Sequence, residues 1–247
     1  MLLEVKQLSS WYGQARALWD IDLMVDEGEV VGVLGRNGAG KSTLLRAIAG
    51  LCPKITGEIV MGARPIARLP THKIALAGMS MLREAGRLAS SLSVAQNIAL
   101  AQRLAHARRR EQPSMSDVLA RFPLLEPLID RKAGLLSGGQ RQALCLAMAF
   151  ASRPSLLLLD EPSAGLAPSV TRELYDSIAH LAESGMTVLV VEQHPAWLSQ
   201  LATRGYLLEM GRVTAEGPLD AILDAVVLQS EAEEAQPSSH MTKEGSA

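Results

Sequence analysis

Short apolar runs and amphipathic stretches alternate along this chain of 247 residues. The apolar segments Glu29–Leu34, Leu156–Leu159 and Met186–Glu192 are short, and the first is rich in β-branched residues and bounded by glycine. Such runs are typical of buried strands. The segments Ser42–Ala49 and Val170–Ala182 have the character of helices, and a glycine follows each of them. The alternation of strands and helices predicts an α/β fold around a mainly parallel sheet.

A helical subdomain is expected over about residues 83–151. The tetrapeptide Ser93–Gln96 has the form of a capping box, which would open a helix running towards Ala107. A second amphipathic helix is predicted from Arg141 to Ala151. The basic run Arg108–Arg110 would end the first of these helices, and we interpret it as a solvated helix end that complements the helix dipole.

The two ends of the chain give weaker patterns. Residues 3–6 alternate between apolar and polar, which indicates a half-exposed strand, but the pattern slips at Gln7. The segment Leu207–Val213, broken by a glycine, predicts a small hairpin. Residues 1–229 are therefore expected to form one domain, and the polar residues 230–247 a disordered tail.

Composition narrows the function classes. The chain has 24 basic and 26 acidic side chains and a net charge of −2, which favours neither nucleic acid nor an anionic membrane surface as a partner. No apolar run reaches the ~18 residues that a membrane span needs, and Met1–Lys6 does not resemble a signal peptide. Cys52 and Cys145 have no metal-binding spacing and are expected to be reduced core thiols. We expect a cytosolic protein that contacts a membrane only through partners.

The segment Gly35–Thr43 fits the phosphate-binding loop pattern G-x-x-x-x-G-K-[ST]. Its glycines let backbone N–H groups point towards a phosphate, and the following helix adds its positive dipole end. Lys41 would bind the β- and γ-phosphates, and the Ser42 hydroxyl would ligate Mg²⁺. A glycine-rich turn with a chance lysine is the alternative, but strand, loop and helix follow in the required order. The predicted nucleotide-binding residues here are Gly35, Arg36, Asn37, Gly38, Ala39, Gly40, Lys41, Ser42 and Thr43.

Two further motifs lie downstream. Asp160 and Glu161 follow the leucine run Leu156–Leu159, so they would stand at the carboxyl edge of the sheet beside the phosphates. The alternative is a helix start, because Asp-Glu-Pro-Ser also has that form. The segment Leu136–Gln140, Leu-Ser-Gly-Gly-Gln, precedes a helix, and its two glycines would expose backbone donors to an anion. A flexible loop is the alternative there.

The order and spacing of these three motifs resemble the ATPase subunit of an ABC (ATP-binding cassette) transporter, over roughly residues 2–223. The resemblance implies a P-loop NTPase domain of the ABC type, with a mainly parallel sheet core, an antiparallel β part and a helical subdomain. It implies that Asp160 holds Mg²⁺ through water and that Glu161 is the general base. It also implies that the Leu136–Gln140 segment contacts the γ-phosphate of ATP held by a partner subunit, so that hydrolysis needs a dimer. The residues of that contact would be Ser137, Gly138, Gly139 and Gln140.

Three further positions follow from the resemblance. Tyr12 resembles the aromatic residue that stacks on adenine, although Trp11 is an alternative and either ring could belong to the core. Glu84 stands where the family has a glutamine that senses Mg²⁺ and touches the membrane subunit. The family's usual offset of about 32 residues from Glu161 lands on Gln193 as the residue that contacts the γ-phosphate. In the alternative, the loop is one residue longer and His194 has this role.

Details of the sequence narrow the resemblance to one of the two ATPases of branched-chain amino-acid importers, or of the related urea-type importers. They are Glu84, the Gly165–Pro168 loop and the tripeptide Val191–Gln193. The segments Arg83–Arg87 and Ala89–Ser90 depart from that subfamily. The resemblance implies ATP and Mg²⁺ as cofactors and, as partners, a second ATPase subunit, identical or different, permease subunits and, indirectly, a solute-binding protein. The chain would then lie on the inner face of the cell membrane.

Two other classes of ABC protein fit the sequence less well. A DNA-repair or translation ABC protein would carry a long coiled coil between the glycine motifs or two cassettes in one chain. Here Lys41 and Ser137 are 137 − 41 = 96 residues apart, and only one cassette is present. A regulatory ABC subunit that hydrolyses weakly is disfavoured by Glu161, although Gln193 at the γ-phosphate position would be compatible with it.

Overall fold

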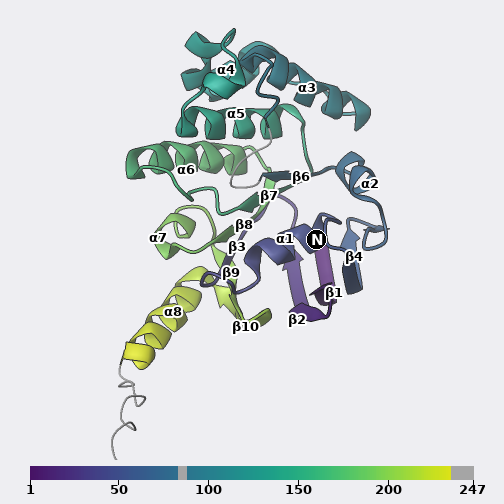
Figure 1. Ribbon diagram of the computed structural model, residues 1–247, viewed down its shortest axis with the longest axis vertical. Coiled ribbons are helices and arrows are strands. Elements are labelled where there is room, and N and C mark those ends of the chain that lie inside the picture. The colour runs from purple at the N-terminus through teal and green to yellow at the C-terminus, as the bar shows by residue number, and fades with distance from the viewer. Residues whose placement is uncertain (83–87, 235–247) are drawn as a thin grey trace, which may run out of the picture.

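The computed structural model describes residues 1–82 and 88–234 of the chain (Figure 1). The segment 83–87, with Glu84, lies outside the described residues, as do residues 235–247. The expectation that Glu84 helps to bind Mg²⁺ therefore stays a prediction.

The larger of two sheets has six strands in the order β10-β9-β3-β8-β7-β6. Its first five members in chain order run parallel, and the last is antiparallel to its neighbour. They are β3 (Val30–Leu34), β6 (Met79–Leu82), β7 (Leu156–Asp160), β8 (Thr187–Glu192), β9 (Arg204–Glu209) and β10 (Arg212–Pro218). The expected mainly parallel core and the C-terminal hairpin are both present.

Both faces of this sheet are covered, which explains its unbroken apolar runs. In β7, Leu157 and Leu159 pack into one hydrophobic cluster, and Leu156 and Leu158 pack into another on the opposite face. Every residue of β3, β7 and β8 is buried. Strands in this position need apolar side chains at consecutive positions instead of the alternation of a half-exposed strand.

The smaller sheet is antiparallel, with the order β2-β1-β4-β5. Its strands are β1 (Leu3–Tyr12), β2 (Ala15–Val25), β4 (Lys54–Met61) and β5 (Arg64–Pro65). Gln7 has φ 48°, and the pairing of β1 shifts between Val5 and Leu8. The slip in the sequence pattern is thus a β-bulge, where an extra residue interrupts the alternation. Helix α1 (Lys41–Ile48) packs in the hydrophobic cluster that joins the two sheets.

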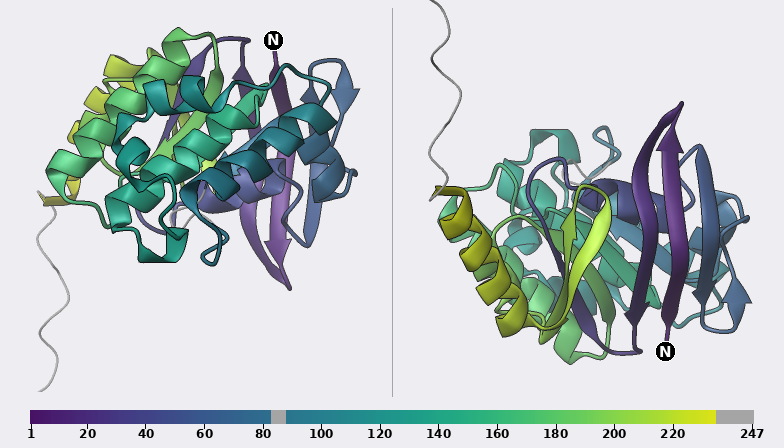
Figure 2. Two further views of the ribbon diagram at one scale, coloured as in Figure 1. Left: turned by 90° about the horizontal axis from the view of Figure 1, so that it is seen from above. Right: turned by 90° about the horizontal axis from the view of Figure 1, so that it is seen from below.

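The remaining helices group mainly at one end of the molecule, over the other face of the six-stranded sheet (Figures 1 and 2). They include α3 (Val94–Ala107), α4 (Met115–Arg121), α5 (Gly138–Ala151) and α6 (Pro168–Glu183), with the short 3₁₀ turns η1 (Pro123–Leu128) and η2 (Ala133–Leu135). The predicted capping box at α3 is formed, since the Ser93 hydroxyl accepts from the Gln96 N–H and the Gln96 side chain accepts from the Ser93 N–H.

Three short or terminal helices complete the fold, namely α2 (Thr71–Leu76), α7 (Pro195–Leu198) and α8 (Leu219–Glu234). Helix α8 continues past residue 230, where the polar tail was expected to begin. The boundary at 230 was therefore placed too early, because a helix with a polar end gives the same composition as a disordered segment. The expectation of disorder for residues 235–247 stays a prediction.

The sequence predicts a solvated helix end at Arg108–Arg110, and for Arg108 this prediction is wrong. Its guanidinium donates to three carbonyl oxygens, those of Ala75 at 3.0 Å, Met79 at 2.7 Å and Ser152 at 2.7 Å. Ala75 lies in the last turn of α2, and Ser152 caps the C-terminus of α5. Burial, with the nearby charge of Arg110 as a smaller cause, lowers the pKa of Arg108 to about 10, so it stays protonated at neutral pH. One cation therefore satisfies the carbonyl ends of helices from both parts of the fold.

The role of Arg108 can be tested by replacing it with methionine, which keeps the apolar stem and removes the guanidinium. We expect Arg108→Met to lower the free energy of unfolding by about 2 kcal/mol, because buried carbonyls lose a charged donor. Arg103→Met, at an exposed position of the same helix, is the matched control and should change it by less than about 0.5 kcal/mol. Urea denaturation measures both, and equal midpoints for the two variants would contradict the role of Arg108.

Candidate functional site

The phosphate-binding loop connects β3 to α1 and closes around its own lysine. The Lys41 Nζ donates to the carbonyl oxygens of Gly35 at 2.7 Å and Arg36 at 3.0 Å, and the side chain is only 3% exposed. A Cβ on Gly35 would lie 2.4 Å from the carbonyl oxygen of Leu208, so no larger residue fits there. Gly40 begins α1 with φ 107°, a conformation that strongly favours glycine. Around the lysine, Arg36, Asn37 and Gly38 are exposed, Ala39 is buried, and Thr43 is half-buried.

The two acids at the end of β7 meet this loop directly. The Ser42 hydroxyl donates to the Asp160 carboxylate at 2.7 Å, and the Lys41 Nζ is 2.9 Å from Glu161 Oε1. Helix α6 begins only at Pro168, so the alternative of a helix start at the two acids is wrong. The predicted residues of the phosphate-binding loop and the two acids after β7 therefore form one site.

Glu161 has an unusual backbone conformation. Its φ is 45°, in the left-handed region, while its N–H donates to the Val191 carbonyl oxygen at 3.1 Å. Non-glycine residues with positive φ are uncommon and are held by their surroundings. The turn thus directs the carboxylate of Glu161 to the lysine instead of along the strand direction.

Ser42 and Asp160 also fit a magnesium ion chemically. A serine hydroxyl and a carboxylate are hard oxygen ligands, and Mg²⁺ is usually bound by one or two carboxylates together with substrate phosphates and water. The two oxygens lie 2.7 Å apart at the N-terminus of α1. The donor set therefore suits the cofactor that the sequence suggested.

The Leu-Ser-Gly-Gly-Gln segment is the N-terminus of α5. Ser137 is the N-cap, its hydroxyl accepts from the Gln140 N–H at 3.3 Å, and the Gln140 side chain accepts from the Ser137 N–H at 3.0 Å. The helix therefore begins at Gly138, not at Arg141 as the sequence had indicated, and the flexible-loop alternative is wrong. A Cβ on Gly139 would lie 2.4 Å from Val170 Cγ1 on α6, which accounts for the second glycine. Ser137 and Gly138 are exposed.

The two adjacent aromatic residues near the end of β1 lie in different surroundings. Trp11 is half-buried, with the charged ends of Arg16 and Lys54 at 5.2 and 4.9 Å from its ring centroid. Tyr12 is 43% exposed, and its hydroxyl lies 3.8 Å from the Cys52 sulfur, just beyond α1. Tyr12 is therefore the ring that is free to stack on a ligand, and its exposure does not fit a core aromatic.

The two candidates for the γ-phosphate contact lie just beyond β8, and both are exposed. Leu34 on β3 pairs with Glu192 on β8. The next residue after Leu34 is Gly35, which begins the phosphate-binding loop, and the next residue after Glu192 is Gln193. His194 is the N-cap of α7, where the chain leaves the sheet. This register favours Gln193 over His194 as the residue beside the phosphate-binding loop.

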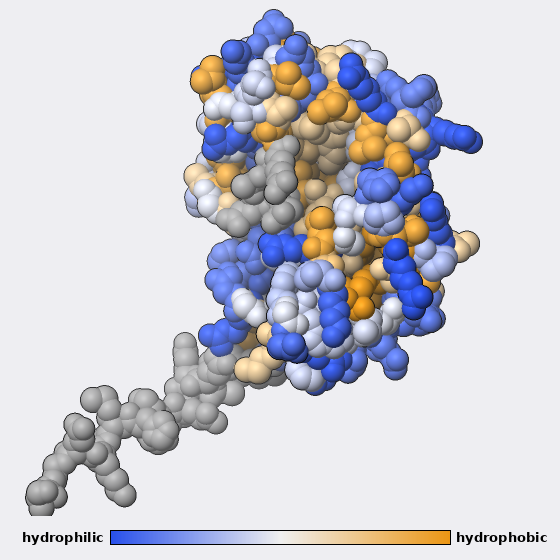
Figure 3. Space-filling view, turned by 45° about the vertical axis from the view of Figure 1, so that its right-hand side comes forward, coloured by the Kyte–Doolittle hydropathy of each residue, from blue (hydrophilic) through white to orange (hydrophobic). Residues whose placement is uncertain are grey.

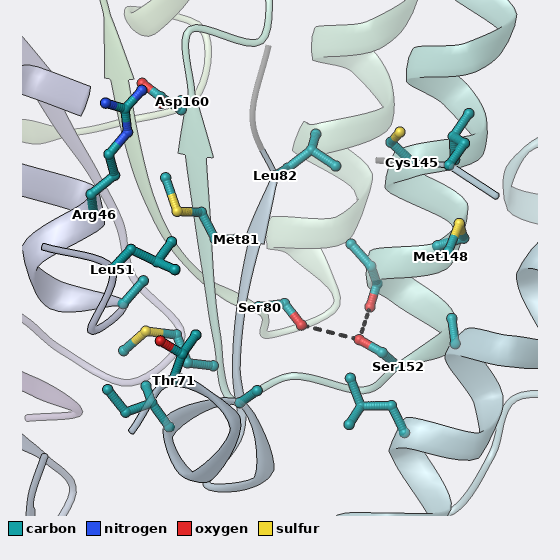
Figure 4. A pocket seen from close by; sticks show the side chains of 18 of the residues that line it. Arg46, Leu51, Thr71, Ser80, Met81, Leu82, Cys145, Met148, Ser152 and Asp160 are labelled. Atoms are coloured by element: carbon teal, nitrogen blue, oxygen red, sulfur yellow. Dashed lines mark hydrogen bonds between the residues drawn. The ribbon is translucent and has the colours of Figure 1, made fainter. Parts of the chain in front are cut away.

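A cavity of about 830 Å³ extends from the two acids between the sheet core and the helices. One end is polar, with Ser42, Asp160 and Glu161, and the rest is lined mainly by apolar side chains such as Leu51 and Leu100. Figure 3 shows this hollow as an apolar surface, and Figure 4 shows its lining residues.

Sequence reasoning missed two polar residues at the site. Arg46 lines the polar end of the cavity, one helical turn after Ser42 on α1 (Figure 4). Glu192 is buried at the end of β8 and accepts hydrogen bonds from Ser163 and Tyr175. A charged residue closing an apolar strand was the available signal for Glu192. The four-residue spacing from Ser42 was the signal for Arg46.

Comparisons with known proteins agree with this geometry. The sequence model of a family described as "ABC transporter" matches residues 18–164. The high-affinity branched-chain amino acid transport ATP-binding protein BraG of Pseudomonas aeruginosa is 36% identical over 222 residues, which cover 90% of this chain and 95% of the relative. The lipopolysaccharide export system ATP-binding protein LptB of Escherichia coli is 33% identical over 224 residues, or 90% and 92%. A solved dimeric ATP-binding cassette in a post-hydrolysis state, bound to ADP and phosphate, has a TM-score of 0.75 and 25% identity, covering 88% of this chain and 99% of that chain.

The exposure of Tyr12 leads to a test with the native cysteines. Cys52 is half-buried beside Tyr12, whereas Cys145 is buried and its pKa is raised by burial to about 11. At about pH 7.5 we expect iodoacetamide to modify Cys52 and to leave Cys145 unmodified, because a buried thiol that is not ionised is a poor nucleophile. If adenine stacks on Tyr12, saturating ATP with Mg²⁺ should slow the modification of Cys52 at least about fivefold. Mass spectrometry measures both rates, and equal Cys52 rates with and without ATP would rule out Tyr12 as the adenine contact.

Proposed function

The chain belongs to the ABC transporter family and is an ATP-hydrolysing subunit, and on this premise we propose that it powers the import of branched-chain amino acids or a similar small polar solute. The observation that carries the proposal is the joining of Lys41, Asp160 and Glu161 in one site, in a chain 36% identical to a branched-chain amino acid transport ATPase. The relative that serves lipopolysaccharide export is 33% identical, so the solute is the part of the proposal that needs its own experiment.

Glu161 is proposed as the general base. In this structure its carboxylate is paired with Lys41. When the phosphates of ATP occupy the loop, Lys41 binds them and releases the carboxylate, which then orients a water molecule and takes its proton during attack on the γ-phosphorus. Mg²⁺ held by Ser42 and Asp160 would neutralise charge on the β- and γ-phosphate oxygens. The products are ADP and inorganic phosphate.

A second ATPase subunit, a copy of this chain or a related one, is proposed to complete the site. Ser137 and Gly138 are exposed at the N-terminus of a 14-residue helix, where backbone N–H groups and the helix dipole favour an anion. These residues would contact the γ-phosphate bound by the partner. The dimeric cassette with ADP and phosphate supports this assembly by similarity.

Permease subunits are proposed to dock on the apolar cavity between the core and the helices. The described residues include no helix with the length and apolar character needed to cross a bilayer. Leu51 and Leu100 line the cavity and are each nearly half exposed, so they offer apolar surface to a partner. The other end of the cavity holds Asp160 and Glu161, which would couple docking to hydrolysis. The chain would thereby sit on the cytoplasmic face of the membrane, with a solute-binding protein delivering the substrate to the permease.

Replacing Glu161 tests the proposed function in cells. Glu161→Gln keeps the shape of the side chain and the phosphate loop, so ATP should still bind, while turnover should fall at least about 100-fold because the base is lost. Uptake of radiolabelled leucine should fall to the level of a strain without the chain. Loss of turnover with unchanged leucine uptake would show that the solute is wrong, and turnover within a few-fold of wild type would show that Glu161 is not the base.

The residue at the γ-phosphate position is tested by a pair of variants. If Gln193 holds this position, Gln193→His should maintain or raise the rate, since histidine can carry positive charge near neutral pH. His194→Ala should change kcat less than about twofold. The assay uses the assembled ATPase pair with the partner's own catalytic glutamate disabled. A collapse of activity in His194→Ala with near-normal activity in Gln193→Ala would assign the role to His194.

A further inference from the structure

A buried carboxylate stands at the junction of the loops that surround the phosphates. Glu192 is 1% exposed and accepts from the Ser163 N–H at 3.3 Å, from the Gln193 N–H at 3.1 Å and from the Tyr175 hydroxyl. No lysine or arginine pairs with it in the part of the chain that the structure describes. A buried charge without a counter-ion depends on its hydrogen-bond donors, so these three contacts are required partners of the carboxylate.

Two of the donors belong to the segments that carry the proposed chemistry. Ser163 is two residues after Glu161, and the N–H of Ala164 donates back to the Glu161 carbonyl oxygen at 3.1 Å. Gln193 is the residue that the register places beside the phosphate-binding loop. One carboxylate therefore fixes the backbone just after the base and the backbone at the γ-phosphate contact at the same time.

A side chain of α5 also contacts this loop. The side-chain amide of Gln142, which is buried, donates to the Pro162 carbonyl oxygen at 3.3 Å. Gln142 lies two residues past the Ser-Gly-Gly-Gln segment that begins this helix, in which Ser137 and Gly138 are exposed. The residues after Glu161 are thus hydrogen-bonded both to Glu192 at the end of β8 and to Gln142 on α5, the helix proposed to face the partner's nucleotide.

The third donor anchors Glu192 to the helices behind the site. The Tyr175 ring, on α6, packs against Trp197 on α7 with 5.3 Å between ring centroids. Burial, followed by the charge of Glu192, raises the pKa of the Tyr175 hydroxyl, so it remains a proton donor throughout the physiological range. The carboxylate is therefore held by a hydroxyl group that stays protonated throughout the physiological pH range.

We propose that Glu192 is a positioning residue that aligns Glu161 and Gln193 for hydrolysis. The inference rests on the proposed roles of these two residues and adds a structural cause for their alignment. A carboxylate only accepts hydrogen bonds, so it can serve both backbone N–H groups and the tyrosine together. A glutamine at this place offers one acceptor atom and one donor group, which leaves at least one of the three donors facing an N–H₂ group.

The test is steady-state ATP hydrolysis by the full chain in its assembled ATPase pair, with the partner's catalytic glutamate disabled. We expect Glu192→Gln to lower kcat about tenfold and to leave the KM for ATP within about twofold, because the Lys41 cradle is untouched. Tyr175→Phe, which keeps the carboxylate and its two backbone donors, should lower kcat about threefold. If Glu192→Gln does not fold, as judged by thermal unfolding, Tyr175→Phe carries the test.

The matched controls lie at the other end of the same sheet. Glu29 pairs with Arg204 at 2.6 Å just before β3, and the buried Tyr206 hydroxyl accepts from the Met24 N–H at 3.0 Å. Glu29→Gln and Tyr206→Phe remove the same chemical groups away from the phosphates, so both should keep kcat within about twofold of wild type.

A double-variant comparison separates positioning from general destabilisation. In a chain that already carries Glu161→Gln, the added Glu192→Gln should lower the residual rate only about twofold, because the main group that it aligns is gone. An undiminished tenfold loss there, an equal loss in Glu29→Gln, or full kcat in both Glu192→Gln and Tyr175→Phe would overturn the inference. If Glu161→Gln itself retained activity, the proposed base would be wrong, which is a separate outcome.

Discussion

The hydrogen-bonded register of β3, β8 and β7 is the constraint on which the site depends. These strands are buried on both faces, so their backbone groups must pair with each other and cannot turn to water. Leu34 is paired with Glu192, and Asp160 with Val191, and all three strands therefore end at the same edge. The phosphate-binding loop, the two acids and Gln193 leave the sheet together at this edge, although they are far apart in the sequence. Ligand sites in open α/β sheets form at the carboxyl ends of strands for this reason.

Much of this arrangement follows from local sequence. The four leucines of β7 predict a strand covered on both faces, and the capping box at Ser93 predicts the start of α3, as observed. The phosphate-binding loop, Asp160 and Glu161 carry their own signals, because glycines, a lysine and strand-end acids have few other uses in this order. The break at Gln7 in the alternation of apolar and polar residues also corresponds to a local feature, the β-bulge of β1.

The residues that escaped prediction are those whose partners are distant in the chain. Arg108 follows two exposed residues of α3 and precedes two exposed arginines, so its neighbours predict solvent, yet its guanidinium bonds to carbonyls more than 25 residues away. Glu192 ends an apolar strand, and nothing in its neighbours indicates the donors on Ser163 and Tyr175. Local periodicity reports average exposure, whereas a buried charge depends on a few contacts set by the tertiary fold. The offset from Glu161 favours Gln193 over His194 from the sequence alone, and the pairing of Leu34 with Glu192 favours the same residue.

The ion pair between Lys41 and Glu161 has a consequence for ligand choice. The lysine of the cradle is paired with the carboxylate that we propose as the base. A nucleoside without its phosphate chain has no anionic group to exchange for that carboxylate, so it leaves the pair intact. In the proposed mechanism, a triphosphate replaces the carboxylate as the counter-ion of the lysine and frees Glu161 in the same event. In the proposed mechanism, the charge of the triphosphate is therefore what separates Glu161 from Lys41.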